Sequence, residues 1–113
     1  MKTELDFLIE EAKKEEKYFK NYKLYAKKIK KVAEEILGKV KVFVFGSILR
    51  KKEIAQDIDV LIISDKVKTA EDKSKVRLKI QKKLGFLAPF EIHLVTPKEY
   101  ENWYKFFIEK RSK

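Results

Sequence analysis

The stretch VFVFGSILRKKEIAQDIDVLII (Val42–Ile63) decides the fold of this chain. It contains two strongly apolar runs of strand length, which are joined by a basic loop. The first run ends in Gly46 and Ser47, and the second begins with Asp57 and Asp59, one residue apart. Runs that are apolar at consecutive positions are typical of strands covered on both faces. Because the connection is short, we predict that the two strands are antiparallel neighbours.

The rest of the chain adds helices and one more strand. Residues 3–37 have helical apolar spacing and predict one long helix, or two helices with a break near Asn21. Residues 64–88 are long enough for a helical crossover, which makes the second and third strands parallel. We therefore predict an α/β (α+β) fold, a small mixed sheet of three or four strands flanked by helices. The expected strands cover residues 39–45, 57–63 and 90–95, and the later helices cover residues 69–84 and 96–113.

The last helix has a clear start and an aromatic stripe. The sequence TPKE at residues 96–99 offers a Thr cap, a Pro at the first helical position and a Glu that completes a capping box. Trp103, Phe106 and Phe107 follow at helical spacing. We interpret this stripe as core packing, and an exposed docking face is the alternative.

Composition narrows the class of protein. The 113 residues suggest one domain, with an N-terminal helical segment (1–38), a sheet core (39–95) and a C-terminal helix (96–113). The net charge of +10 indicates a polyanionic partner such as nucleotide or nucleic acid, or else a Lys-rich soluble surface. The Lys and Glu content is also typical of a heat-adapted protein.

The absence of cysteine excludes disulfides, thiolate zinc sites and a cysteine nucleophile. With neither a signal-peptide core nor a membrane-length apolar run, we expect a cytoplasmic protein.

Three acidic residues are expected to converge at one edge of the sheet. Asp57 and Asp59 point to the same face of their strand, and the Gly-Ser pair lies beside them. In a parallel third strand, Glu91 reaches the same edge, and His93 follows on the same face as a hydrogen-bonded core residue or a pocket-lining residue. Two such charges 4 Å apart repel by about 4 kcal/mol at an effective dielectric near 20, so a divalent cation would stabilise the cluster. Oxygen ligands favour Mg²⁺ or Mn²⁺, although solvated strand ends are the alternative interpretation.

Three motifs together resemble a known family. They are VFVFGS (Val42–Ser47), DIDVLI (Asp57–Ile62) and FEIHLVT (Phe90–Thr96), and they span about half of the chain. In motif, spacing and element order the chain resembles the DNA polymerase beta-type nucleotidyltransferase superfamily, most closely its minimal, MNT-like branch. The resemblance implies a polymerase beta palm-like fold. It also implies transfer of NMP from an NTP, with ATP first among the candidates, to an acceptor hydroxyl.

The resemblance assigns roles residue by residue. Asp57, Asp59 and Glu91 match the catalytic carboxylates, which hold Mg²⁺ or Mn²⁺, two ions in the usual arrangement. The nucleotide-binding residues it implies are Gly46 and Ser47, which match the triphosphate loop, and Arg50, which matches a basic position able to pair with phosphate. The chain departs from the family pattern at three positions of the loop, where we expect effects on loop shape and substrate fit: Leu49, Lys51 and Gln56.

Three function classes remain open. The first is a metal-dependent nucleotidyltransferase whose acceptor site is completed by a partner. The resemblance implies either a small helical HEPN protein, as in toxin–antitoxin pairs, or a second copy. The second is a catalytically weak or inactive regulatory subunit that keeps the fold and binds a partner through the C-terminal helix. The third is a basic nucleic-acid-binding domain, whose affinity would depend strongly on salt. Nucleic acid also stays open as the acceptor.

Overall fold

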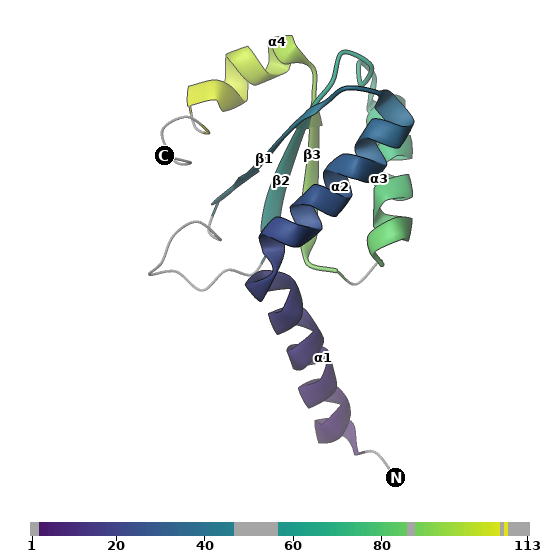
Figure 1. The fold of residues 1–113 in the computed structure, drawn as a ribbon, viewed down its shortest axis with the longest axis vertical. Coiled ribbons are helices and arrows are strands. Elements are labelled where there is room, and N and C mark those ends of the chain that lie inside the picture. Colours follow the sequence, from purple (N-terminus) through teal and green to yellow (C-terminus); the bar gives the residue numbers. More distant parts are fainter. Residues whose placement is uncertain (1–2, 47–56, 86–87, 107, 109–113) are drawn as a thin grey trace.

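A three-stranded sheet forms the centre of the molecule. The computed structural model describes residues 3–46, 57–85, 88–106 and 108, with the backbone alone for residues 11–15. Strands β1 (Lys41–Phe45), β2 (Ile58–Ile63) and β3 (Phe90–Val95) lie in the order β1-β2-β3 (Figure 1). β1 is antiparallel to β2, and β3 is parallel to β2. Both predicted strand pairings are therefore confirmed, as is the mixed α+β fold class.

The central strand β2 is covered on both faces because its side chains alternate between two apolar clusters. Val60 and Ile62 belong to the larger cluster, together with residues of two long helices. Leu61 and Ile63 belong to a smaller cluster on the opposite face, which the C-terminal helix covers. All four side chains are buried. This double burial explains why the sequence of β2 is apolar at consecutive positions after Asp59.

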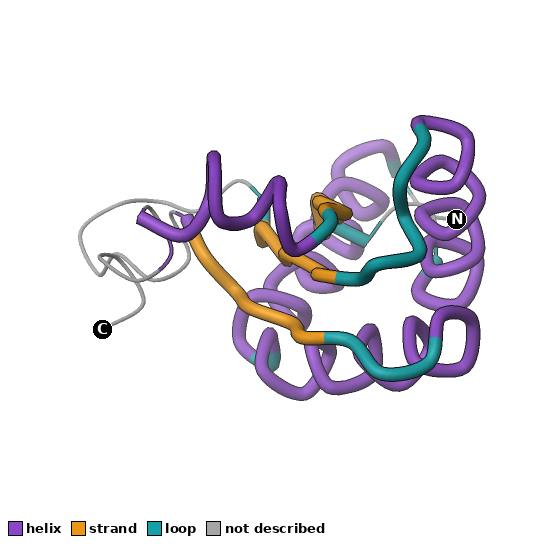
Figure 2. Tube along the Cα trace, turned by 90° about the horizontal axis from the view of Figure 1, so that it is seen from above, coloured by secondary structure: helices purple, strands orange, loops and turns teal. Residues whose placement is uncertain are grey.

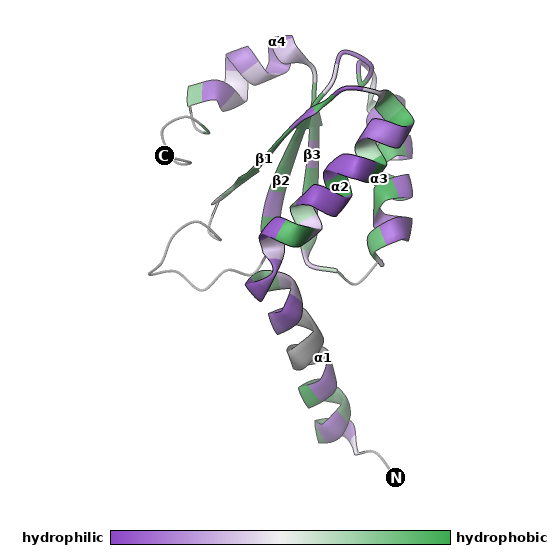
Figure 3. Cartoon of the chain, viewed as in Figure 1, coloured by the Kyte–Doolittle hydropathy of each residue, from purple (hydrophilic) through white to green (hydrophobic). Residues whose placement is uncertain are grey.

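Helices α2 (Tyr22–Leu37) and α3 (Ala70–Leu84) close one face of the sheet. They lie on the side of the sheet away from the C-terminal helix, as the views in Figures 1 and 2 agree. Ile29 and Ala33 of α2 and Ile80 of α3 are completely buried there. In Figure 3 the apolar colouring of α2 and α3 is confined to part of each helix, as expected for helices with one buried face.

The N-terminal segment consists of two helices, as one of the two alternatives predicted. α1 (Glu4–Lys20) begins with a capping box between Thr3 and Asp6, and ends at Asn21, where the backbone leaves the helical region. The last turn of α1 reaches the core, where the Tyr18 ring packs at a tilt against Tyr25 and edge-on against Phe90. The remainder projects away from the sheet (Figure 1). Within the described residues, no helix is both long enough and apolar enough to cross a membrane.

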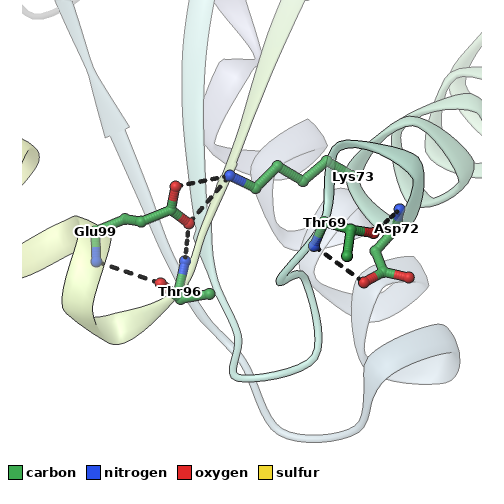
Figure 4. Close-up of polar contacts among 5 residues, drawn as sticks. All are labelled: Thr69, Asp72, Lys73, Thr96 and Glu99. Carbon is green, nitrogen blue, oxygen red and sulfur yellow. Dashed lines mark hydrogen bonds and ion pairs between the residues drawn. The ribbon is translucent and has the colours of Figure 1, made fainter.

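The C-terminal helix starts where the sequence predicts. α4 (Pro97–Glu99) has Thr96 as its cap, and Thr96 and Glu99 form the expected capping box. Lys73 Nζ donates to both carboxylate oxygens of Glu99, at 2.8 and 3.0 Å, and so ties the start of α4 to α3 (Figure 4). The helix then continues as a π-helical turn, η2 (Tyr100–Tyr104), in which Lys105 N–H donates to Tyr100 O.

The interpretation of the aromatic stripe as core packing is wrong for Trp103 and Phe106, which are 69% and 77% exposed. The side chains that pack on the sheet are instead Tyr100, Tyr104 and Ile108. Trp103 lies within the π turn, whose i→i+5 hydrogen bond departs from the α-helical spacing on which the interpretation was based. Phe107 lies outside the described residues.

Candidate metal and nucleotide site

The candidate site is built where β1 ends and where β2 and β3 begin. In the strand register, Asp59 is the partner of Phe45 on one side and of Glu91 on the other. Because side chains alternate, Asp59, Glu91 and His93 all lie on the sheet face that carries Leu61. The C-terminal helix covers the other half of this face and leaves the acidic half accessible. Sheet register alone therefore brings two of the predicted carboxylates together.

The three side chains converge closely. His93 Nε2 lies 3.2 Å from Asp59 Oδ1 and 3.8 Å from Glu91 Oε1. One potential ligand atom from each of the three residues lies within 4.8 Å of the others. Asp59 and His93 are mostly buried, whereas the Glu91 side chain is 59% exposed. The three groups are close enough to share one divalent cation after side-chain movements that bring each ligand atom to about 2.0–2.2 Å from the ion.

Asp57 occupies a different place from Asp59. It is exposed and precedes the first paired residue of β2, Ile58. It lines a pocket of 580 Å³ next to Glu91 and His93, but it is not one of the three converging residues. The strand pairing of β2 therefore determines the position of Asp59 but not that of Asp57. The role of Asp57 as a ligand stays a prediction.

The pKa of Glu91 is shifted by its position in the cluster. Burial raises this pKa above its ordinary value, and a hydrogen bond with Asp59 and the charges of Asp59 and Asp57 raise it further. The nearby His93 acts in the opposite direction. A carboxyl group with a raised pKa beside other carboxylates indicates a place where a cation is favourable.

Gly46 is required at this edge for two reasons. Its φ of 85° lies in the left-handed region that L side chains rarely adopt. A Cβ atom at this position would also overlap Asp59 Oδ2. The family resemblance implies that Gly46 belongs to the triphosphate loop. The structure adds that the missing side chain leaves space for the Asp59 carboxylate.

The phosphate side of the predicted site falls on residues that the structure does not describe. Ser47 and Arg50 lie outside the described residues, as do the three positions that depart from the family pattern: Leu49, Lys51 and Gln56. Their assigned roles therefore stay predictions.

Two residues of α3 line the same pocket and were not singled out from the sequence. Arg77 and Gln81 line it together with Asp57, Glu91 and His93. Arg77 Nε donates to the carbonyl of Ile92, at 3.1 Å, between the two site residues of β3. A signal was present in the sequence, because each follows directly after a residue of the buried α3 face and the two are spaced i, i+4.

Comparisons with known proteins agree with this geometry. The family model described as "Nucleotidyltransferase domain" matches residues 26–113. The chain belongs to the nucleotidyltransferase domain family. A crystal structure of a provisionally assigned nucleotidyltransferase is similar, with 31% sequence identity and a TM-score of 0.59. The match covers 73% of this nucleotidyltransferase and 89% of that chain. Among curated proteins no significant match is found.

The family assignment confirms two of the predictions made from the sequence. The resemblance to the nucleotidyltransferase superfamily is confirmed, and the protein is a transferase that acts on nucleotides. The minimal, MNT-like branch, the metal, the acceptor and the partner are finer statements that the family alone does not establish.

Proposed function

We propose that this nucleotidyltransferase transfers an NMP group from an NTP to an acceptor hydroxyl and requires a divalent cation. The observation that carries the proposal is the convergence of Asp59, Glu91 and His93 within 4.8 Å at the strand edge. In a member of the nucleotidyltransferase family, such a cluster is best explained as the site where the ion and the triphosphate meet. ATP is the first candidate donor.

The carboxylates of Asp59 and Glu91 would hold the cation, and Asp57 at the pocket entrance would complete the set. A bound Mg²⁺ or Mn²⁺, or two such ions, supplies Lewis-acid chemistry that favours the deprotonated acceptor hydroxyl and offsets the charge of the phosphates. The donor set supports this assignment because it contains no sulfur and is mainly carboxylate oxygen. Without a cation, the raised pKa of Glu91 disfavours the fully ionised cluster.

The proposed chemical step makes one bond at the α-phosphorus and breaks another. The acceptor oxygen forms a bond to the α-phosphorus, and the bond from that phosphorus to the bridging oxygen breaks. Pyrophosphate leaves with the electron pair. Glu91 would accept the hydroxyl proton, because its side chain is accessible beside Asp59. We assign Gly46, Ser47 and Arg50 to the triphosphate, with the position of Gly46 next to Asp59 as support.

We further propose that the chain is of the minimal, MNT-like type and acts with a partner. A HEPN-type helical protein is the candidate that the resemblance implies, and a second copy is the alternative. The exposure of Trp103 and Phe106 supports the C-terminal helix as the contact surface. Transfer of the label to the partner, to RNA or to a small molecule would identify the acceptor.

Transfer from NTPs labelled at the α-phosphate tests the proposed function. We expect Asp59→Asn and Glu91→Gln to lower the rate by about 100-fold or more, because each removes a ligand of the cation. Asp65→Asn is the matched control, since Asp65 is an exposed acid just after the opposite end of β2 and should have no effect. Full activity of Asp59→Asn would contradict the proposal.

A further inference from the structure

His93 holds a position that the three-carboxylate pattern does not explain. It is the partner of Leu61 in the parallel ladder and shares its face with Asp59 and Glu91. Its ring lies 5.1 Å from that of Phe45 and 6.1 Å from that of Tyr104, and these contacts restrict its orientation. The same nitrogen, Nε2, faces the carboxylates of both Asp59 and Glu91.

A single imidazole nitrogen cannot satisfy both carboxylates through one hydrogen. Nε2 carries either one hydrogen or one lone pair, so it can donate to Asp59 at 3.2 Å while Glu91 at 3.8 Å receives no second hydrogen from it. A cation between the three groups would accept electron pairs from all of them. A ligand role therefore accounts for the approach of Nε2 to both carboxylates, whereas a hydrogen bond accounts for its approach to Asp59 alone.

We propose that His93 is a ligand of the metal ion, and that it consequently raises the affinity of the site for imidazole-binding ions such as Co²⁺ and Zn²⁺ relative to its affinity for Mg²⁺. This inference rests on the proposed function, because it concerns the ion held by the same carboxylates. Sites built from oxygen alone suit Mg²⁺, whereas imidazole suits first-row transition ions, whose affinity rises from Mn²⁺ through Co²⁺. One nitrogen added to two carboxylates therefore shifts the relative affinity of the site toward first-row transition ions.

The competing explanation is that His93 only positions Asp59 by a hydrogen bond. His93→Gln separates the two roles, because the Gln amide can still donate a hydrogen bond but lacks the imidazole nitrogen. A positioning role predicts that Gln preserves ion binding. A ligand role predicts that Gln selectively weakens the binding of transition ions.

The first measurement needs no variant. His93 is the single histidine of the chain, so any imidazole nitrogen coupled to a bound ion must come from it. The protein is prepared without a histidine tag, loaded with Mn²⁺ and examined by electron spin echo envelope modulation. We expect ¹⁴N modulation from a directly coordinated imidazole. Bound Mn²⁺ without this modulation would overturn the inference.

The second measurement compares ion affinities by calorimetry, with Co²⁺ and Mg²⁺ titrated separately. We expect His93→Gln to weaken Co²⁺ binding by about tenfold or more, and Mg²⁺ binding by less than about threefold. Asp65→Asn serves as the control and should change neither affinity. Equal losses for both ions, or no loss for Co²⁺, would contradict the ligand role.

The results separate this inference from the proposed function. NMP transfer without imidazole coordination would overturn the role of His93 and leave the proposed function intact. Imidazole coordination without NMP transfer from any NTP would support the role of His93 and contradict the proposed function.

Discussion

At the scale of single residues, the site depends most directly on a side chain that is missing. Gly46 ends β1 beside Asp59, and a Cβ atom there would overlap the carboxylate. The carboxylate is the group that must stay in place, because it is central to the cluster. The glycine therefore determines the orientation of an acid that lies thirteen residues further along the chain.

Gly46→Ala should damage both stability and ion binding. The positive φ alone costs about 1–3 kcal/mol, to be measured by denaturant unfolding, and the displaced Asp59 should lower metal affinity in calorimetry. Gly38→Ala is the matched control, because Gly38 has a similar φ of 80° but its Cβ would meet only Lys66 Nζ, at 3.7 Å. We expect a similar loss of stability with unchanged ion affinity. Equal ion affinity in the two variants would show that Gly46 makes no space for Asp59.

The residues of the site were predictable to the extent that strand alternation and register determine them. Asp59, Glu91 and His93 share a face because their strands are adjacent and parallel, and both properties follow from the lengths of the connections. Asp57 has the same alternation but precedes the ladder, so its exposed position could not be derived. The overlap that makes Gly46 necessary depends on backbone angles, which the sequence pattern does not contain.

At the scale of elements, the ion pair between Lys73 and Glu99 joins α3 to the start of α4 (Figure 4). The hydrogen bonds from Lys73 lower the pKa of Glu99 most. A hydrogen bond from the backbone N–H of Thr96 lowers it further. A lowered pKa means that the ionised form is favoured in the folded state. The resulting stabilisation is present above the ordinary pKa of a glutamate and is lost as the pH falls through the lowered value.

Glu99→Gln should therefore destabilise the protein at neutral pH and have less effect in acid. We expect a loss of about 1 kcal/mol at pH 7, because the variant keeps a weaker cap but loses the ion pair. The stabilities of the variant and the wild type should approach each other as the pH is lowered below about 4. Urea unfolding at several pH values measures this. A difference that is independent of pH would show that ionisation of Glu99 does not contribute.

The C-terminal helix shows how far element-level prediction reaches. Its start was predictable, because the TPKE sequence fixes the cap and the first turn through local hydrogen bonds. The direction in which the aromatic side chains point was not predictable, because the helix contains a π turn at Tyr100–Tyr104. Tyr104, which lies in that turn, contacts Phe45 and His93, and both are distant from it in sequence. Local spacing cannot show a helix distortion whose benefit comes from tertiary contacts.

At the scale of the whole molecule, the N-terminal helix and the sheet differ in how much tertiary packing stabilises them. The first turns of α1 expose Leu5, Phe7 and Leu8, each at least 59% accessible, and they project from the core (Figure 3). The first 20 residues are also nearly neutral, so the excess positive charge belongs almost entirely to the rest of the chain. The part of the chain that carries the site is thus also the part that attracts polyanions.

Hydrogen exchange should separate these two parts. Isolated helices of this length are only marginally stable in water, so amides in the first three turns of α1 should exchange within about tenfold of the unfolded rate. Amides of β2 should exchange only through global unfolding. Mass spectrometry after peptic digestion, or NMR, measures both. Equal protection of α1 and β2 would indicate that another surface, such as that of a second copy, covers α1 in solution.

The register that joins β1, β2 and β3 also links ligand binding to folding. Gly46 directly follows β1, whereas Asp59 lies in β2 and Glu91 lies in β3, and the long crossover through α3 lies between the last two. No fragment with a single strand pair would contain the whole site, so the ion of the proposed function would bind only the completed fold. An ion at a hundredfold excess over its dissociation constant adds about 2.7 kcal/mol to the stability of a fold that alone binds it. The concentration of free ion in the cell would then act as a determinant of how much of this chain is folded.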